Sequence, residues 1–288
     1  MMISIFDRNH LQCGVLFAML SGAGSLALAQ DELIFADDFD RMFIDCLDCP
    51  ELVLIPAGTF VQGSPPDEPQ RSATEGPQRT VTVPTFAVSR TEITFADWDA
   101  CVADGGCNHN PDDSTWGRGD RPVMNVSWND VQEYLAWLSS KSGKAYRLPS
   151  ESEWEYATRA GSTGRFNTGD CITTDQANFD GLSPAVGCPT GAFPFETVPV
   201  KSYAENVFGL YDTHGNVWEW VPDCWNSSYD GAPIDGSAWN AGDCNRGVLR
   251  GGSFNDVGQN LRSANRSWAP RDFRGNFIGF RIARTISP

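Results

Sequence analysis

Histidine and positive charge are scarce in this chain. Its 288 residues include three histidines, and 21 lysines and arginines stand against 37 aspartates and glutamates, for a formal net charge of −16. Such an acidic chain repels polyanions, which argues against a nucleic acid partner and suits a cation-binding protein. Beyond residue 29 only His109 and His214 remain, neither with metal-binding spacing, and His214 is expected to be an exposed turn residue. A Gly-x-Ser-x-Gly motif, a phosphate loop and a serine triad are also absent, which removes common enzyme signatures.

Long apolar runs are missing after the N-terminus. The single such run, residues 11–28, follows Arg8 and ends in Ala27-Leu28-Ala29, a small-residue cleavage site before Gln30. Its Gly and Ser content and the cleavage site favour a signal peptide, residues 1–29, over a retained membrane span. We therefore expect an exported bacterial protein, periplasmic or secreted, without a membrane span after cleavage.

Cysteine is absent after Cys244, although the chain has nine cysteines. Cys13 leaves with the signal peptide, and the remaining eight, an even number in an oxidising compartment, predict disulfides. Eight cysteines allow many pairings, but their spacing favours local pairs. The first pair has redox spacing, yet no βαβ pattern surrounds it, which favours a structural role. The expected pairs are Cys46–Cys49, Cys101–Cys107, Cys171–Cys188 and Cys224–Cys244.

Regular secondary structure is expected to be short and scattered. Three segments, 94–104, 127–142 and 150–160, begin with a serine or threonine that is followed three residues later by an acidic residue, which predicts capped helices. Runs rich in β-branched and aromatic residues predict strands. The expected strands are 53–60, 80–88, 217–221, 248–254 and 278–283.

Two stretches are expected to be loops. Residues 64–77, rich in Pro, Ser and Glu, predict an exposed loop. Residues 162–206 have no periodic pattern, and so long a loop in a compact domain is usually functional or held by ligands. Short helices and strands among long loops predict one α+β domain over residues 51–288, preceded by an acidic extension over residues 30–50.

The stretch 209–221 begins as a turn and ends as a strand. Gly215-Asn216 is a strong turn signal, and in the strand that follows Glu219 shares one face with two valines. A carboxylate there needs a partner. Together with Asp212 across the turn and with turn carbonyls, it would form the oxygen cage that calcium prefers. The alternative partners of Glu219 are an arginine or backbone N–H groups.

This stretch resembles the Gly-Leu-Tyr-Asp-Met-x-Gly-Asn-Val-Trp-Glu-Trp signature of the formylglycine-generating enzyme family, the sulfatase-modifying factor domain. Further matching segments follow in the family's order, at 54–60, 122–128, 146–157, 249–254 and 279–281. The resemblance implies the formylglycine-generating-enzyme variant of the C-type lectin-like fold, which is poor in regular structure.

The resemblance also implies structural calcium. At the matching positions, one calcium site takes the side chains of Asp212 and Glu219 and the carbonyls of Gly215 and Val217. All four positions are compatible with a hard cation.

A second calcium site of the family begins at a position matched by Asn178 and the carbonyl of Phe179. The aspartate that completes this site aligns near Ala192, which cannot serve as a ligand. Asp180 or Glu196 would have to substitute for it.

Formylglycine-generating enzymes depend on two cysteines that bind copper(I) through soft thiolates. In this chain Asp256 matches the first of them and Leu261 lies near the second. A carboxylate and a leucine cannot replace a thiolate pair. We therefore expect no bound copper, no formylglycine generation and no catalytic residue at these positions.

The segment 255–276 mixes arginine, asparagine and aromatic residues, which are enriched in recognition surfaces. By the resemblance it lies over the family's substrate groove. Trp268, Arg271 and Phe273 are therefore candidates for binding a peptide, protein or glycan ligand, unless these arginines simply pair with carboxylates. Three further arginines beside apolar strand residues are expected to be structural: Arg250, Arg262 and Arg281.

These observations favour an exported, calcium-stabilised domain that works by binding. One alternative is an oxidoreductase of the formylglycine-generating enzyme superfamily, a copper or non-heme metal oxidase with other ligands. A second alternative is a structural component of a cell-surface assembly, with residues 30–50 as its tether.

Overall fold

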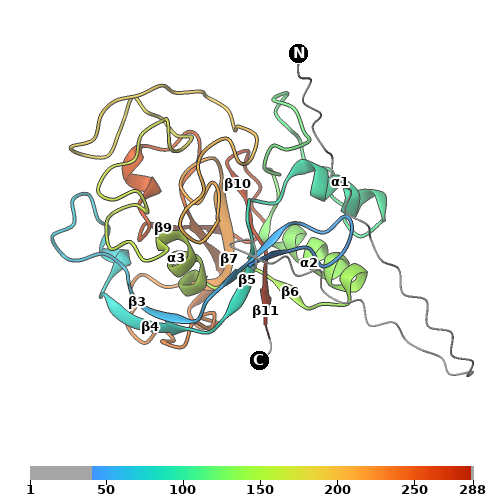
Figure 1. Ribbon diagram of the computed structural model, residues 1–288, viewed down its shortest axis with the longest axis horizontal. Coiled ribbons are helices and arrows are strands. Elements are labelled where there is room, and N and C mark those ends of the chain that lie inside the picture. The colour runs from blue at the N-terminus through green and yellow to red at the C-terminus, as the bar shows by residue number, and fades with distance from the viewer. Residues whose placement is uncertain (1–40, 287–288) are drawn as a thin grey trace, which may run out of the picture. The chain divides into compact units, whose positions relative to one another are not determined.

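The computed structural model describes residues 41–286 (Figure 1). The expected signal peptide and most of the expected acidic extension lie outside these residues. Within residues 41–286, no helix combines the length and apolarity that a membrane crossing requires. The last part of the extension contains β1 (Met42–Phe43), which pairs with β2 (Leu52–Ile55).

All three predicted helices are present, and each begins at the expected cap. Thr94, Ser127 and Ser150 each accept a hydrogen bond from the backbone N–H three residues on, and the acidic residue at that position bonds back to the cap. These reciprocal bonds satisfy N–H groups that the first turn leaves unpaired. The helices are α1 (Phe95–Ala103), α2 (Trp128–Ser142) and α3 (Glu151–Arg159), with 3-10 turns η1 (Ala73–Glu75) and η2 (Gly258–Leu261).

The strands form three small sheets, which confirms the α+β class. One sheet has the order β1-β2-β5-β11-β6, a second has the order β10-β7-β8-β9, and β3 pairs with β4. Their bounds are β3 (Gly58–Gln62), β4 (Arg79–Val83), β5 (Phe86–Ser89), β6 (Tyr146–Arg147), β7 (Trp218–Trp225), β8 (Asp243–Arg250), β9 (Arg266–Pro270), β10 (Ile278–Gly279) and β11 (Ala283–Thr285).

Several predicted strands are wrong in extent. The expected strand 53–60 is interrupted at Pro56, and the expected strand 80–88 is interrupted at Pro84, because proline has no N–H group for the ladder. At each proline the chain therefore passes between the five-stranded sheet, which contains β2 and β5, and the two-stranded sheet of β3 and β4. The expected strand 278–283 is likewise split between two sheets, which leaves Arg281 between them.

The loop 64–77 was predicted to be exposed, and this is wrong for part of it. Ser64 and Glu75 are fully buried, and the Ser64 hydroxyl donates to Glu75 (2.7 Å). Arg262 reaches the same carboxylate with two hydrogen bonds of 2.6 and 2.7 Å. Ser64 and Glu75 are buried because Arg262, far along the chain, binds the Glu75 carboxylate, and local sequence does not reveal such a contact.

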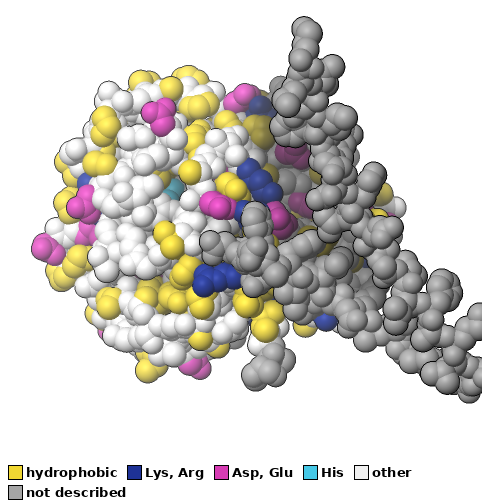
Figure 2. Space-filling model, viewed as in Figure 1, with side chains coloured by type: hydrophobic (Ala, Val, Ile, Leu, Met, Phe, Trp, Pro, Cys, Tyr) yellow, Lys and Arg dark blue, Asp and Glu magenta, His cyan; other side chains and the backbone are white. Residues whose placement is uncertain are grey.

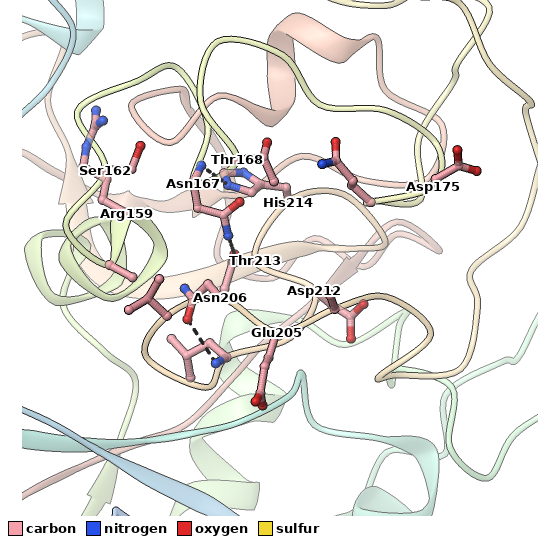
Figure 3. A pocket seen from close by; sticks show the side chains of 15 residues that line it. Arg159, Ser162, Asn167, Thr168, Asp175, Glu205, Asn206, Asp212, Thr213 and His214 are labelled. Carbon is pink, nitrogen blue, oxygen red and sulfur yellow. Dashed lines mark hydrogen bonds between the residues drawn. The ribbon is translucent and has the colours of Figure 1, made fainter. Parts of the chain in front are cut away.

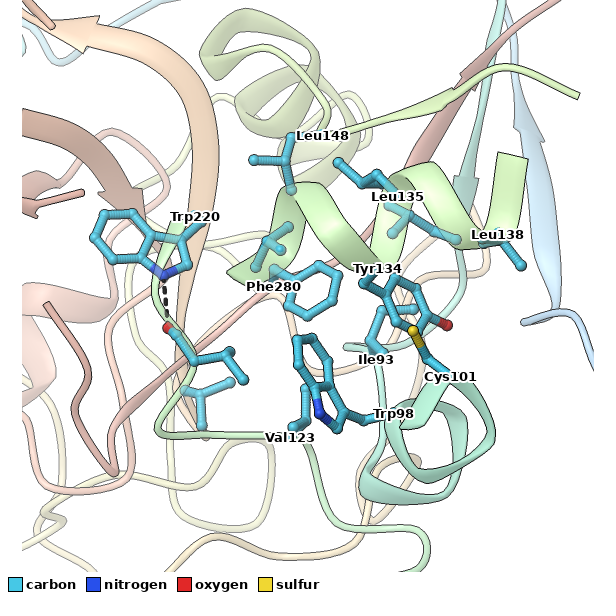
Figure 4. Packing of buried hydrophobic residues seen from close by; sticks show 14 of the residues in the cluster. Ile93, Trp98, Cys101, Val123, Tyr134, Leu135, Leu138, Leu148, Trp220 and Phe280 are labelled. Atoms are coloured by element: carbon cyan, nitrogen blue, oxygen red, sulfur yellow. Dashed lines mark hydrogen bonds between the residues drawn. The ribbon is translucent and has the colours of Figure 1, made fainter. Parts of the chain in front are cut away.

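The main core lies between α1, α2 and the strands (Figure 4). Trp98 stacks on Tyr134 with ring centroids 5.7 Å apart, and the ring edge of Phe280 meets both rings. Such aromatic pairs add about 0.5–1.5 kcal/mol each beyond their buried area. Val217 and Trp220 belong to the same cluster, so the core fixes the strand that follows the predicted turn.

The four predicted disulfides are all present as local pairs, which include every cysteine of residues 41–286. Acidic side chains are scattered over the visible face of the molecule and do not gather in one patch (Figure 2). The net charge alone therefore does not mark a site on this face.

Candidate functional site

The first part of the stretch 209–221 lines a polar cavity before the chain enters β7. The cavity has a volume of about 430 Å³, and the stretch supplies Asp212, Thr213 and His214 to its wall (Figure 3). Side chains from the long loop after α3 form other parts of the wall, among them Asn167 and Thr168. The lining is rich in amides, hydroxyls and carboxylates, which suits a polar or charged occupant.

The predicted turn at Gly215-Asn216 is present and holds several segments together. Gly215 has φ of 81°, and a Cβ there would lie 2.2 Å from the carbonyl oxygen of Asn178, so only glycine fits. The Asn216 side chain accepts hydrogen bonds from the Asn178 amide (3.1 Å) and the Val198 N–H (3.0 Å) and donates to Glu92 (2.7 Å). The turn therefore fixes the loop residues around it.

Three buried carboxylates meet one arginine beside this turn, a group that we call the signature cluster: Glu92, Asp212, Glu219 and Arg281. Arg281 binds Glu219 through two hydrogen bonds of 2.6 and 2.7 Å, and the Trp154 indole N–H donates to the same carboxylate (2.7 Å). Of the two alternatives to calcium considered for Glu219, an arginine and backbone N–H groups, the structure thus contains the arginine.

Only one of the two carboxylate oxygens of Asp212 has a hydrogen-bond partner. One carboxylate oxygen accepts the Lys201 N–H (2.9 Å), while Oδ1 is buried with no hydrogen-bond partner. Burial raises the pKa of the Asp212 carboxyl to about 6. Burial also raises the pKa of Glu92 well above its usual value, and the charges of Asp212 and Glu219 add to this rise. Within residues 41–286, however, no three His, Cys, Asp or Glu side chains converge as a ready metal-ligand set.

The residues of the second predicted calcium site each have different neighbours. Asn178 is buried with an unpartnered Oδ1, and Phe179 packs in a small apolar cluster. Asp180 accepts the backbone N–H two residues on (3.0 Å), and Glu196 forms an ion pair with Arg121 (3.3 Å). The two carboxylates that would have to complete this site therefore already have partners.

His214 was expected to be exposed, and this is wrong. It is buried, and its two ring nitrogens bond to the Leu261 carbonyl (2.7 Å) and to the Asn167 N–H (3.1 Å). This pattern assigns the proton to Nδ1. Burial lowers the pKa of His214 to about 4, so the ring is neutral near pH 7. No local pattern predicts these hydrogen bonds, because both partners come from distant parts of the chain.

Asp256 and Leu261 lie beside the turn, Asp256 partly exposed and Leu261 buried. Asp256 accepts hydrogen bonds from the Trp218 indole (2.7 Å), the Ser253 hydroxyl (2.5 Å) and the Asn260 amide (2.7 Å). The Leu261 side chain is fully buried in an apolar cluster with Phe166 and Phe179 as neighbours. One position is thus a satisfied carboxylate and the other a core residue.

Trp268 lies on β9 and is 39% exposed. The Arg246 guanidinium covers one face of its ring at 3.8 Å from the centroid, and the Trp225 ring centroid lies 6.3 Å away at a tilt of 46°. Arg246 thus leaves only part of the Trp268 side chain open to a ligand.

Arg271 and Phe273 follow in the next loop. Arg271 stacks on Trp128 (4.0 Å) and donates to the Pro222 carbonyl (2.8 Å), while its Nε is buried without a partner. Phe273 is 40% exposed beside Phe277. The three predicted binding residues, which we call the strip, thus follow one another along the chain in β9 and the loop after it.

A second buried ionic group, which we call the balanced cluster, joins α3 to β7, β8 and β9. Arg250 donates to Glu155 (2.6 Å), and Arg266 binds Glu151 through hydrogen bonds of 2.8 and 2.7 Å. As predicted, the structural arginines 250, 262 and 281 are buried in ion pairs. The cluster contains Glu151, Glu155, Asp223, Arg159, Arg250 and Arg266.

Comparison with known proteins gives consistent matches. Residues 39–286 match the model of the "Sulfatase-modifying factor enzyme 1-like domain". A formylglycine-generating enzyme of Streptomyces coelicolor is 38% identical to this chain over 177 residues. The match covers 58% of this chain and 54% of that enzyme. The "Inactive C-alpha-formylglycine-generating enzyme 2" of Mus musculus is 28% identical over 81% of this chain and 85% of its own. The solved structure of PvdO from Pseudomonas aeruginosa is 41% identical, with a TM-score of 0.75 over 85% of this chain and 98% of PvdO.

Proposed function

Because the chain belongs to the family of the sulfatase-modifying factor enzyme 1-like domain, we propose that it is an exported, calcium-stabilised recognition domain that does not generate formylglycine. Its fold is the predicted formylglycine-generating-enzyme variant of the C-type lectin-like fold. One observation carries the proposal: by the family resemblance, Asp256 matches the position of the first oxidase thiol and Leu261 lies near that of the second.

Neither residue can supply a soft ligand for copper(I). The Asp256 carboxylate is a hard ligand whose two oxygens already accept hydrogen bonds, and Leu261 has no donor atom. A thiol from elsewhere does not compensate, since every cysteine of residues 41–286 is in a disulfide. One relative from Mus musculus is itself named as inactive, so family membership and this activity separate in at least one other chain.

The signature cluster fits a calcium ion in part. Asp212 Oδ1 is buried without a partner, and an unpartnered carboxylate oxygen in a cluster with excess negative charge is suited to a hard cation. Glu219 retains one acceptor site on Oε1, because three of the four lone-pair positions of its carboxylate are taken. Asp212, Glu219 and the carbonyls of Gly215 and Val217 would hold the ion, which supplies positive charge to the cluster.

The strip of Trp268, Arg271 and Phe273 is our candidate surface for a peptide, protein or glycan ligand. Phe273 is its best anchor, because it is aromatic and 40% exposed, whereas Arg246 covers one face of Trp268. Export is supported by the four disulfides, which persist in oxidising compartments.

The first prediction tests the missing activity. The purified protein, loaded with copper under oxygen, is incubated with a sulfatase-type cysteine peptide, and the peptide mass is followed. We expect no conversion to formylglycine, whereas a formylglycine-generating enzyme run in parallel should convert the peptide. Asp256→Asn, which keeps the shape of the side chain, should be equally inactive. Formylglycine formed by the wild-type chain would overturn the proposal.

A further inference from the structure

The disulfide Cys171–Cys188 lies in a region with little regular structure. It closes residues 171–188 within the long loop between α3 and β7, and both cysteines are partly exposed. The disulfide Cys101–Cys107, by contrast, is buried against the main core, with its cysteines 0% and 4% exposed. A small molecule in solution can therefore approach Cys171–Cys188 without unfolding the domain.

An arginine without an ion-pair partner lies against this disulfide. Arg165 Nη2 is 3.6 Å from Cys188 Sγ and donates to the Val186 carbonyl (3.2 Å). Its Nη1 is buried with no hydrogen-bond partner, and none of the ion pairs found within residues 41–286 includes Arg165. A guanidinium beside sulfur stabilises the thiolate, which makes Cys188 the better leaving group of the pair.

We propose that Cys171 is a thiol-exchange site for low-molecular-weight thiols of the glutathione class. The attacking thiolate forms a new S–S bond to Cys171 Sγ while the Cys171–Cys188 bond breaks, and its electron pair leaves on Cys188 Sγ beside Arg165. A second thiolate can then attack the mixed disulfide. That step releases Cys171 as a thiolate and the small thiol as its own disulfide, so two thiols are oxidised for each protein disulfide reduced.

The exchange would loosen a loop that contacts the candidate site. Asn178 bonds to the turn through Asn216 (3.1 Å), and the Asp180 N–H donates to the Asp256 carbonyl (3.0 Å). Gln176 of the same loop lines the cavity. Opening the disulfide would remove the covalent closure of the segment that carries these contacts.

A second arginine–disulfide contact provides an internal comparison. Arg271 Nη2 lies 3.8 Å from Cys224 Sγ, at the disulfide Cys224–Cys244. Cys244 is exposed, but Cys224 is 3% exposed and lies in β7, which is paired with β8 around this position. Breaking this disulfide leaves the hydrogen bonds between β7 and β8 in place. The two cysteines should therefore stay close together, and the disulfide should re-form quickly.

The second prediction tests this site. The oxidised native protein is mixed with reduced glutathione, aliquots are alkylated over time, and each cysteine is quantified by peptide mass. Cys171–Cys188 should open about tenfold faster than Cys101–Cys107, and the glutathione adduct should be on Cys171. Arg165→Met should slow this opening about three- to tenfold, whereas Arg165→Lys should retain most of the rate.

Arg271→Met is the matched control and should leave the Cys171–Cys188 rate unchanged. Opening of all four disulfides in one step, an adduct on Cys188, or an unchanged rate in Arg165→Met would each overturn the proposal. If Arg165→Met does not fold, the proposal is tested on the wild-type protein alone, by the order in which its disulfides open and by the cysteine that carries the glutathione adduct.

Discussion

The two buried ionic clusters of this domain differ in charge balance. The balanced cluster has three carboxylates and three guanidinium groups, whereas the signature cluster has three carboxylates against Arg281 alone. Both are shielded from water, so their charges are weakly screened. If all its groups are ionised, the signature cluster carries two uncompensated negative charges in the domain interior.

The pKa values of Glu151 and Asp212 reflect this difference in charge balance. In the balanced cluster burial favours the protonated form, but Arg266 and Arg250 hold the pKa of Glu151 below its usual value. In the signature cluster burial raises the pKa of Asp212 to about 6, and one oxygen has no partner. Asp223 is an exception in the balanced cluster, since burial and the charge of Glu151 raise its pKa to about 7. The two clusters therefore differ in the number of opposite charges around their carboxylates, and under our proposal a calcium ion would supply the positive charge that the signature cluster lacks.

The third prediction breaks the balanced cluster and has the largest expected effect. Arg250→Met should lower the free energy of unfolding by about 3–5 kcal/mol, because it leaves the fully buried Glu155 without its closest cation. Urea unfolding followed by fluorescence measures the loss. Arg246→Met removes an exposed ion pair with Asp243 and should change stability by less than about 1 kcal/mol. Equal losses in the two variants would refute the contrast between buried and exposed pairs.

The fourth prediction concerns Asp212 in calcium-free protein. An acid with a raised folded-state pKa binds its proton more tightly when folded, so its ionisation lowers stability as the pH rises from 3.8 to about 6. Above that range Asp212→Asn should be more stable than the wild-type protein, by up to about 3 kcal/mol. Below the range the difference should vanish.

Chemical unfolding of both proteins in chelator across this pH range measures the effect. The variant, which lacks the ionised carboxylate, should also lose most of the stabilisation by added calcium. Asp230→Asn, at an exposed position, should match the wild-type protein under all these conditions. A pH-independent difference between Asp212→Asn and wild type would show that ionisation of Asp212 is not its cause.

Local features of this fold could be predicted from the sequence. Helix caps such as Ser127 with Asp130, and disulfides such as Cys101–Cys107, depend on residues a few positions apart. Their chemistry is complete within one short segment, so pattern and spacing suffice. The turn at Gly215 was predictable for the same reason.

Long-range pairs could not be predicted in this way. Arg262 meets Glu75 from a position 187 residues away, and Arg281 reaches Glu219 because the chain crosses between two sheets. The burial of His214 likewise depends on two loops that the sequence does not bring together. Residue types showed that arginines and carboxylates would pair, but only the fold determines which ones do.

The fifth prediction tests the signature cluster most directly, by thermal unfolding of the wild-type protein in chelator and in excess calcium at matched ionic strength. Calcium that binds only the folded state should raise the Tm, with a stabilisation of about 2.7 kcal/mol at a free concentration 100 times the Kd. Glu219→Gln should lose most of this shift. Identical melting of the wild-type protein in chelator and in calcium would contradict calcium binding at this cluster.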